Sequence, residues 1–174
     1  MNKTKFFLSI SLIISLMSST VAYAFPFFVL PEAPEFENNV VVTSGEQILL
    51  INGKEHTMPA EVYYSENAKT LMVPIRYICL AVGLSENAVK WDAANSAIVI
   101  DTTRRQVWMQ ANKTHYYLNR ALVPILSDAG NVGIVEIVGD RAYVPYNTIG
   151  EALGITYELT EDGTGVRFNF PTQM

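Results

Sequence analysis

An internal repeat constrains the fold of this chain more than any other feature of its sequence. Residues 71–84 read LMVPIRYICLAVGL and residues 142–155 read AYVPYNTIGEALGI, so that an offset of 71 aligns a Val, a Pro, an Ile, an Ala and a Gly. Self-similarity at a fixed spacing is the signature of one supersecondary unit that occurs more than once. Both copies are therefore expected to adopt the same local structure.

Each copy predicts a strand followed by a short helix. Pro74 has a fixed φ and lacks an N–H, which suits the first turn of a helix. Gly83 and Gly154 predict the two helix ends. The apolar stripes at helical spacing are Ile75, Ile78, Cys79 and Val82 in the first copy and Tyr146, Ile149, Gly150 and Leu153 in the second. Helices of two to three turns are unstable alone in water, so both are expected to pack on a sheet.

The segments around the helices predict antiparallel strands. Polar turns separate residues 89–91 from 97–100 and residues 156–159 from 166–170, which is a hairpin pattern. Residues 48–51 run into the turn dipeptide Asn52-Gly53, and Asn119-Arg120 follows residues 116–118 in the same way. The order strand, strand, short helix, hairpin occurs twice. It predicts an α+β fold of two repeated, mostly antiparallel units, each with one helix packed on the sheet.

Residues 1–24 are typical of a cleavable signal peptide. Lys3 and Lys5 precede an uncharged, mostly apolar run at residues 6–17, and Ala22-Tyr23-Ala24 forms an A-x-A cleavage site. The run is shorter than the roughly 20 residues that a membrane-spanning helix needs. We therefore expect cleavage after Ala24, export to the periplasm, cell wall or cell exterior, and no integral membrane segment in the mature protein.

The mature chain is expected to be acidic and to form one repeat domain. Residues 25–45, rich in proline, predict an extended lead-in or linker that ends in an edge strand at residues 40–42. Residues 46–174 form the domain, with units at about 46–101 and 106–170. Cleavage removes two lysines and no acid, which takes the formal charge from −5 to −7 and argues against a nucleic-acid partner. The single cysteine, Cys79, has apolar neighbours and is expected to be a buried thiol.

Several short motifs carry a family resemblance. They are Asn52-Gly53-Lys54, Val73-Pro74-Ile75-Arg76-Tyr77-Ile78, Ala81-Val82-Gly83, Val89-Lys90-Trp91-Asp92 and Ile98-Val99-Ile100. In this order they resemble the copper amine oxidase N-terminal-like domain, also called the stalk domain, over about residues 46–170. The second copy keeps Val144, Pro145 and Gly154, with Asn147 in place of Arg76 and Tyr157-Glu158 in place of Trp91-Asp92.

The resemblance implies a non-catalytic structural or binding module of the cell envelope. In that family copper and the quinone cofactor belong to a separate catalytic domain, so we expect no cofactor, no metal and no catalytic residue here. The residues agree, because His56 and His115 are the only histidines and copper sites of that kind need several. Neither a nucleophile motif nor a phosphate-binding loop occurs.

The adjacent tyrosine pairs Tyr63-Tyr64 and Tyr116-Tyr117 are candidate ligand-binding aromatics. Neighbouring residues of a strand point to opposite faces, so one member of each pair is expected to be exposed. Exposed aromatic rings can stack on sugars, which keeps a glycan- or peptidoglycan-binding module as an alternative. An envelope hydrolase with dispersed carboxylates is another alternative. Cell-wall glycan and another envelope protein are the expected partners.

The remaining motif residues have structural interpretations. We expect Arg76 to pair with Asp92 or Glu86, which would tie the first helix to the following hairpin. Arg104, Arg105 and Arg141 are expected to be solvated. The residues taken as the structural motif are Val73, Pro74, Arg76, Gly83, Trp91, Asp92, Val144, Pro145 and Gly154.

Overall fold

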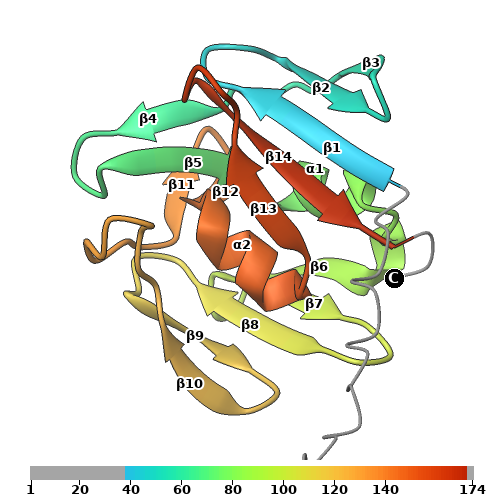
Figure 1. Cartoon of the computed structure of the whole chain (residues 1–174). Helices are drawn as coiled ribbons and strands as arrows, with labels where there is room; N and C mark the ends of the chain where they lie inside the picture. The colour runs from blue at the N-terminus through green and yellow to red at the C-terminus, as the bar shows by residue number, and fades with distance from the viewer. Residues whose placement is uncertain (1–37, 172–174) are drawn as a thin grey trace, which may run out of the picture. The chain divides into compact units, whose positions relative to one another are not determined.

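A computed structural model describes residues 38–171. The predicted signal peptide and most of the predicted lead-in lie outside the described residues. Within them the chain forms three sheets of antiparallel strands and two short helices (Figure 1). This agrees with the predicted α+β class. No helix among the described residues is both long enough and apolar enough to span a bilayer.

The first sheet places the start of the described chain at its centre. Its strands lie in the order β13 (Thr156–Leu159), β14 (Gly165–Phe170), β1 (Asn38–Thr43), β2 (Ile48–Ile51) and β3 (Lys54–Thr57). The prediction of an edge strand at residues 40–42 is wrong in its position. β14 pairs along one side of β1 and β2 along the other, so β1 lies inside the sheet, and Val40 and Val42 are fully buried on the face that meets the core.

The second sheet has the order β10 (Ala121–Pro124), β9 (His115–Leu118), β8 (Gln106–Gln110), β7 (Ala97–Asp101) and β6 (Val89–Asp92). Its β9–β10 turn and the β2–β3 turn of the first sheet have the same backbone conformation. Asn52-Gly53 and Asn119-Arg120 all have positive φ, as two-residue hairpin turns with matching twist require. Each turn asparagine also accepts a hydrogen bond through Oδ1 at 2.8 Å, from the N–H of Asn39 or of Gln106.

The third sheet joins the two copies of the repeat. Its order is β11 (Glu136–Val138), β12 (Arg141–Pro145), β5 (Thr70–Pro74) and β4 (Tyr63–Ser65). The repeat strands β5 and β12 pair antiparallel, and Val73 lies opposite Val144, its own counterpart in the repeat. Both valines are fully buried, so the repeated motif forms the middle of this sheet.

The helices begin where the prolines predict. Helix α1 (Ile75–Ala81) follows Pro74 and α2 (Tyr146–Leu153) follows Pro145, and the short 3₁₀ helix η1 (Glu86–Ala88) precedes β6. Gly154 ends α2 with φ 70°. Arg105, expected to be solvated, caps the same helix end. Its Nη1 donates to the carbonyl oxygens of Glu151 at 3.0 Å and of Ala152 at 3.4 Å, where helix carbonyls lack partners.

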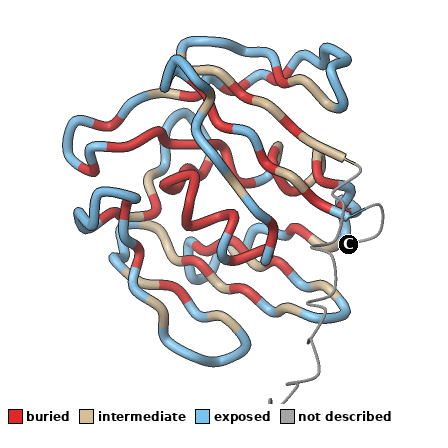
Figure 2. The backbone as a smooth tube through the Cα atoms, in the orientation of Figure 1, coloured by how far each residue is buried: buried red, intermediate tan, exposed pale blue. Residues whose placement is uncertain are grey.

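One core unites these elements, and the two predicted units are not separate bodies. Buried side chains from all three sheets and both helices form one cluster, which follows the red segments of the tube in Figure 2. The β6–β7 hairpin of the first predicted unit shares a sheet with β8, β9 and β10 of the second. The β13–β14 hairpin of the second unit shares a sheet with β1, β2 and β3. Each five-stranded sheet therefore needs strands from both halves of the chain.

Candidate functional site

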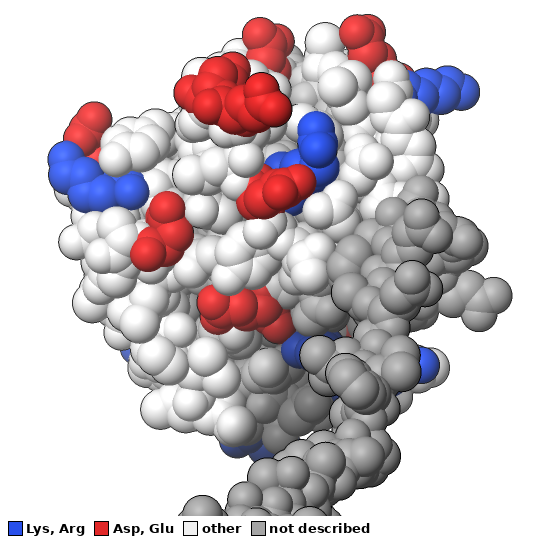
Figure 3. Space-filling view, in the orientation of Figure 1, with Lys and Arg blue, Asp and Glu red and all other residues white. Residues whose placement is uncertain are grey.

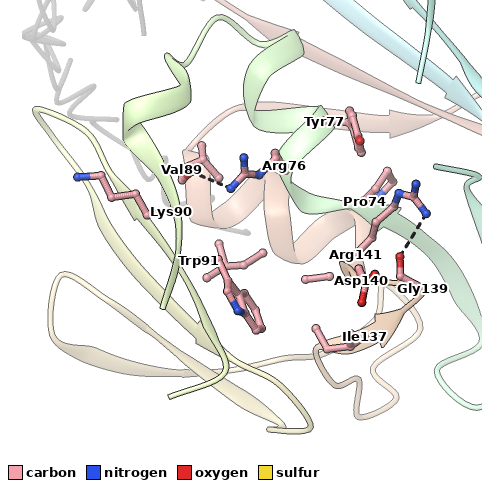
Figure 4. Close-up of a pocket in the computed structure, with 12 residues that line it drawn as sticks. Pro74, Arg76, Tyr77, Val89, Lys90, Trp91, Ile137, Gly139, Asp140 and Arg141 are labelled. Atoms are coloured by element: carbon pink, nitrogen blue, oxygen red, sulfur yellow. Dashed lines mark hydrogen bonds between the residues drawn. The ribbon is translucent and has the colours of Figure 1, made fainter. Parts of the chain in front are cut away.

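A groove of about 590 Å³ lies between β6, the start of α1 and the turn that joins β11 to β12 (Figure 4). This volume falls within the range of about 300–1,000 Å³ that ligand pockets occupy. Its walls include two of the motifs that carry the family resemblance. Pro74 and Arg76 come from the first motif, and Val89 and Trp91 come from the second.

Trp91 provides the largest apolar surface in the groove. Trp91 is 45% exposed, and β6 is the last strand of its sheet, with no described strand along its outer edge. Ile137 of β11, 42% exposed, lines the other side of the groove. Figure 4 shows the indole directed into the space between these elements. An exposed indole beside an exposed aliphatic side chain offers an apolar surface that a ligand could bury.

The polar lining of the groove is mainly basic. Arg76, Lys90 and Arg141 are its three basic lining residues and Asp140 is the acidic one, although Figure 4 shows the Lys90 ammonium directed away from Trp91. Arg76 Nη2 donates to the Val89 carbonyl at 3.3 Å, and Arg141 Nη1 donates to the Gly139 carbonyl at 3.3 Å. Neither guanidinium is within salt-bridge distance of a carboxylate among residues 38–171. These arginines therefore keep donors for a ligand.

The predicted pairing of Arg76 with Asp92 or Glu86 is wrong. Arg76 does tie α1 to β6, but through the Val89 carbonyl. The Asp92 carboxylate is engaged in its own turn, where it accepts hydrogen bonds from the main-chain N–H of Ala94 and from both nitrogens of Asn95. The hydrogen bond from the Asn95 side chain is the main reason that the pKa of Asp92 is lowered.

The positive groove contrasts with the charge of the chain, which is −5 overall. Figure 3 shows several groups of acidic side chains and few basic ones over the face that it presents. A local excess of cations on an acidic protein is informative, because it favours an anionic ligand at that place while the remaining surface repels one.

The start of α2, unlike that of α1, is covered by a loop of the chain itself. The loop at residues 125–135 lies against it, and the side-chain amide of Asn147 donates to the Leu126 carbonyl at 2.7 Å. Thr70 Oγ1 of β5 donates to Asp128 Oδ1 at 3.0 Å. Burial and the charge and hydrogen bond of Asp128 raise the pKa of the Tyr146 phenol. Side chains of α2 and β5 thus hold this loop, with its single carboxylate Asp128, in place.

The four candidate tyrosines have different environments. Tyr64 and Tyr117 are 50% and 40% exposed, which confirms that one member of each pair faces solvent. Tyr63 is half-buried and donates its hydroxyl to Glu136 at 2.6 Å. Tyr116 is 1% exposed in the core, so its selection as a ligand-binding aromatic is wrong. The inner face of β9 packs against the core and leaves no ring surface of Tyr116 for a sugar.

Tyr117 belongs to an aromatic row on the outer face of the second sheet. The strand register places Val99, Trp108, Tyr117 and Leu122 side by side across four strands. The Trp108 and Tyr117 rings are 5.7 Å apart and tilted, and the His115 ring is 6.3 Å from that of Tyr117. Sequence reasoning missed this row, because the register that brings Trp108 beside Tyr117 cannot be read from either strand alone.

The remaining chemistry-bearing residues form no site. His56 lies exposed on β3 and His115 lies on β9. Within residues 38–171 no group of three or more His, Cys, Asp or Glu side chains is placed to hold a metal ion. Cys79 is buried in the core, as predicted, and burial raises the pKa of its thiol to about 12.

The three antiparallel sheets and two short helices make a small α+β domain. A family model described as the copper amine oxidase N-terminal domain matches residues 50–167. The chain therefore belongs to the copper amine oxidase N-terminal domain family. Comparisons with curated proteins and with solved structures gave no match. The match supports a non-catalytic, stalk-like module.

Proposed function

We propose that this chain is an exported, non-catalytic binding module of the cell envelope and that the groove beside Trp91 is its ligand site. The observation that carries the proposal is the groove itself. A half-exposed indole, an exposed isoleucine and two arginines without carboxylate partners line it, and they come from four separate elements, β6, β11, α1 and β12. The signal-peptide pattern of residues 1–24 supports export.

We further propose that the domain consists of two units related by a local two-fold axis. The axis passes between Val73 and Val144, which are counterparts in the repeat and lie opposite each other in the third sheet. The matched hydrogen bonds of Asn52 and Asn119 support the same relation. In this arrangement each half contributes strands to the sheet of the other. Neither unit can bury its apolar face alone, so the two must fold together.

Co-sedimentation tests the proposed site. The mature protein, residues 25–174, is mixed with purified cell-wall sacculi, and the pellet is assayed for protein and metal. We expect retention that Trp91→Ala abolishes, because this change removes the largest apolar surface in the groove. Leu159→Ala is the matched control, since it removes a similarly exposed apolar side chain from β13, outside the groove and away from the candidate aromatics. Unchanged retention of Trp91→Ala would contradict the groove as ligand site, and stoichiometric copper would contradict a non-catalytic module.

A second candidate function is glycan binding on the aromatic row. The tilted rings of Trp108 and Tyr117 lie on a solvent-facing sheet, where a sugar ring can stack on them. In the same assay this alternative predicts that Tyr117→Ala abolishes retention and that Trp91→Ala leaves it unchanged. An envelope hydrolase gains no support from the groove, because Asp140 is the one carboxylate in its lining and glycoside hydrolysis uses two.

A further inference from the structure

The loop that covers α2 occupies the counterpart of the open groove. The repeat offset relates Pro145 to Pro74, Asn147 to Arg76 and Thr70 to Arg141. Pro145, Asn147 and Thr70 contact or adjoin the loop. Their counterparts Pro74, Arg76 and Arg141 line the groove. Gly133 of the loop lies so close to Pro145 that a Cβ there would be 2.7 Å from Pro145 Cγ. One half of the domain therefore fills the position that the other half leaves open.

A difference in linker length explains why only one half is filled. The link between β3 and β4 spans residues 58–62, whereas the link between β10 and β11 spans residues 125–135. Both begin alike, because the N–H of Met58 donates to Gln47 at 2.8 Å and the N–H of Ile125 donates to Thr114 at 2.7 Å. The extra residues of the longer link form the loop over Asn147. The shorter link has no such loop to place over Arg76.

The contacts of the loop indicate what a groove of this kind accepts. Asn147 donates to a main-chain carbonyl of the loop, that of Leu126, and Thr70 donates to a carboxylate, that of Asp128. The occupant in this half is therefore a short turn of peptide with an aspartate. Its ends are held together by the Leu126–Val132 bridge and by the hydrogen bond from the Ser127 N–H to the Asn131 carbonyl.

The open groove presents stronger versions of the same donors. Arginines replace both the asparagine and the threonine, and a guanidinium binds a carboxylate with charge-assisted, often bidentate, hydrogen bonds. Trp91 stands where the second copy has Tyr157, which enlarges the apolar wall. Charge complementarity with Arg76 and Arg141 then favours an acidic occupant.

We propose that the open groove binds an acidic peptide turn of a partner protein, with an aspartate or glutamate carboxylate on Arg141, a main-chain carbonyl on Arg76 and an apolar side chain against Trp91. This inference rests on the proposed function, because it requires the groove to be the ligand site. It goes further in naming peptide as the ligand class and in deriving the mode of binding from the half of the domain that is already filled.

Fluorescence titration tests the inference with a probe taken from the chain itself. The probe is a synthetic peptide with the sequence of residues 125–133, closed into a ring by a disulfide between added terminal cysteines. The protein is residues 25–174 with Trp108→Phe, so that Trp91 is its one tryptophan. We expect a saturable change in Trp91 emission. The peptide with Asn in place of the aspartate should bind about tenfold more weakly, because it loses a charge-assisted contact.

Protein variants locate the contact. Arg141→Gln should weaken binding by about tenfold, since it removes one of the two guanidinium groups. Arg167→Gln on β14 is the matched control, because that arginine is exposed, lies outside the groove and should leave the affinity unchanged. Circular dichroism of each variant checks that the fold is retained. Equal affinity for the aspartate and asparagine peptides, or equal affinity of Arg141→Gln and the parent protein, would overturn the inference.

A sugar probe separates failure of this inference from failure of the proposed function. The tetramer of N-acetylglucosamine is titrated into the same protein. If the sugar changes Trp91 emission and millimolar peptide does not, the groove is a ligand site for glycan and the peptide inference is overturned. If neither probe changes Trp91 emission and wall retention does not depend on Trp91, both the inference and the groove as ligand site are overturned.

Discussion

Gly150 lies in the middle of α2, and its replacement by alanine offers a direct test of how this helix packs. A Cβ at Gly150 would overlap Tyr157 Cδ1 and would lie 3.0 Å from Tyr157 Cγ. These atoms belong to the base of the ring and cannot move without moving the whole side chain. Tyr157 is also held by an edge-on contact with Tyr146 at 5.7 Å and by its hydroxyl, which donates to Glu151 at 3.2 Å.

The expected loss of stability follows from two opposing effects. Forcing one methyl group into a packed core costs about 1–3 kcal/mol, and the close approach to Tyr157 favours the upper end of this range. Alanine in place of glycine inside a helix recovers about 1 kcal/mol. We therefore expect Gly150→Ala to lower the free energy of unfolding by about 2 kcal/mol. For a domain of this size that corresponds to a Tm lower by roughly 6–10 °C.

Thermal and urea unfolding followed by circular dichroism measure this loss. The matched control is the double variant Gly150→Ala/Tyr157→Ala, compared with Tyr157→Ala alone. Without the ring, the alanine at position 150 should be neutral or stabilising, since only its helix propensity remains. A Gly150→Ala protein as stable as the parent, or more stable, would refute the packing argument. So would an equal loss in the presence and the absence of the Tyr157 ring.

Three further predictions concern a helix cap, an exposed carboxylate and the buried thiol. Arg105→Ala should lower the free energy of unfolding by about 1 kcal/mol in urea titrations, because the last carbonyls of α2 lose their donor, whereas Arg104→Ala should have no effect. Hydrogen bonds from Thr160 and Thr164 lower the pKa of Asp162 to about 2. The stabilising contribution of Asp162 should therefore be present above about pH 4 and be lost toward pH 2, and Asp162→Asn should flatten that part of the stability–pH curve. Cys79, whose thiol pKa burial raises to about 12, should not react with a thiol reagent at pH 8 in the native protein but should react once per chain in guanidinium chloride; rapid labelling of the native protein would contradict its burial.

The local elements could be predicted because their causes are local. Pro74 and Gly83 mark the ends of α1, and Asn52-Gly53 makes its turn because both residues adopt positive φ. None of these features depends on a distant part of the chain. The α+β class and the positions of the hairpins follow from the same kind of signal.

Pairing between distant strands could not be predicted, and the errors follow from this. Residues 40–42 carry a strand signal, but the strand lies at the centre of its sheet because β14, more than a hundred residues further on, pairs with it. Alternation along β9 shows that one of Tyr116 and Tyr117 is exposed. Which one it is depends on the face that meets the core, and tertiary packing decides that.

The groove could be predicted in its parts but not as a site. Arg76 and Trp91 were recognised from their motifs, yet they were given structural roles because the sequence places them fifteen positions apart on different elements. Arg141 and Ile137 come from the other half of the chain and reach the groove only through the pairing of β5 with β12. The predicted partner of Arg76 is wrong for a similar reason. The acceptor is the main-chain carbonyl of Val89, and no feature of the sequence marks a main-chain carbonyl as an acceptor.

The pairing of β1 with β14 also determines how the domain would respond to force. Asn38 pairs with Phe170, so the first and last strands of the described fold begin and end at the same place. A load that pulls these two ends apart would act along the interstrand hydrogen bonds and break the pairs in succession, from Asn38 and Phe170 inward. Such unzipping resists little force compared with the simultaneous shearing of a whole strand. A domain connected in this way is mechanically soft along the line between these two strand ends.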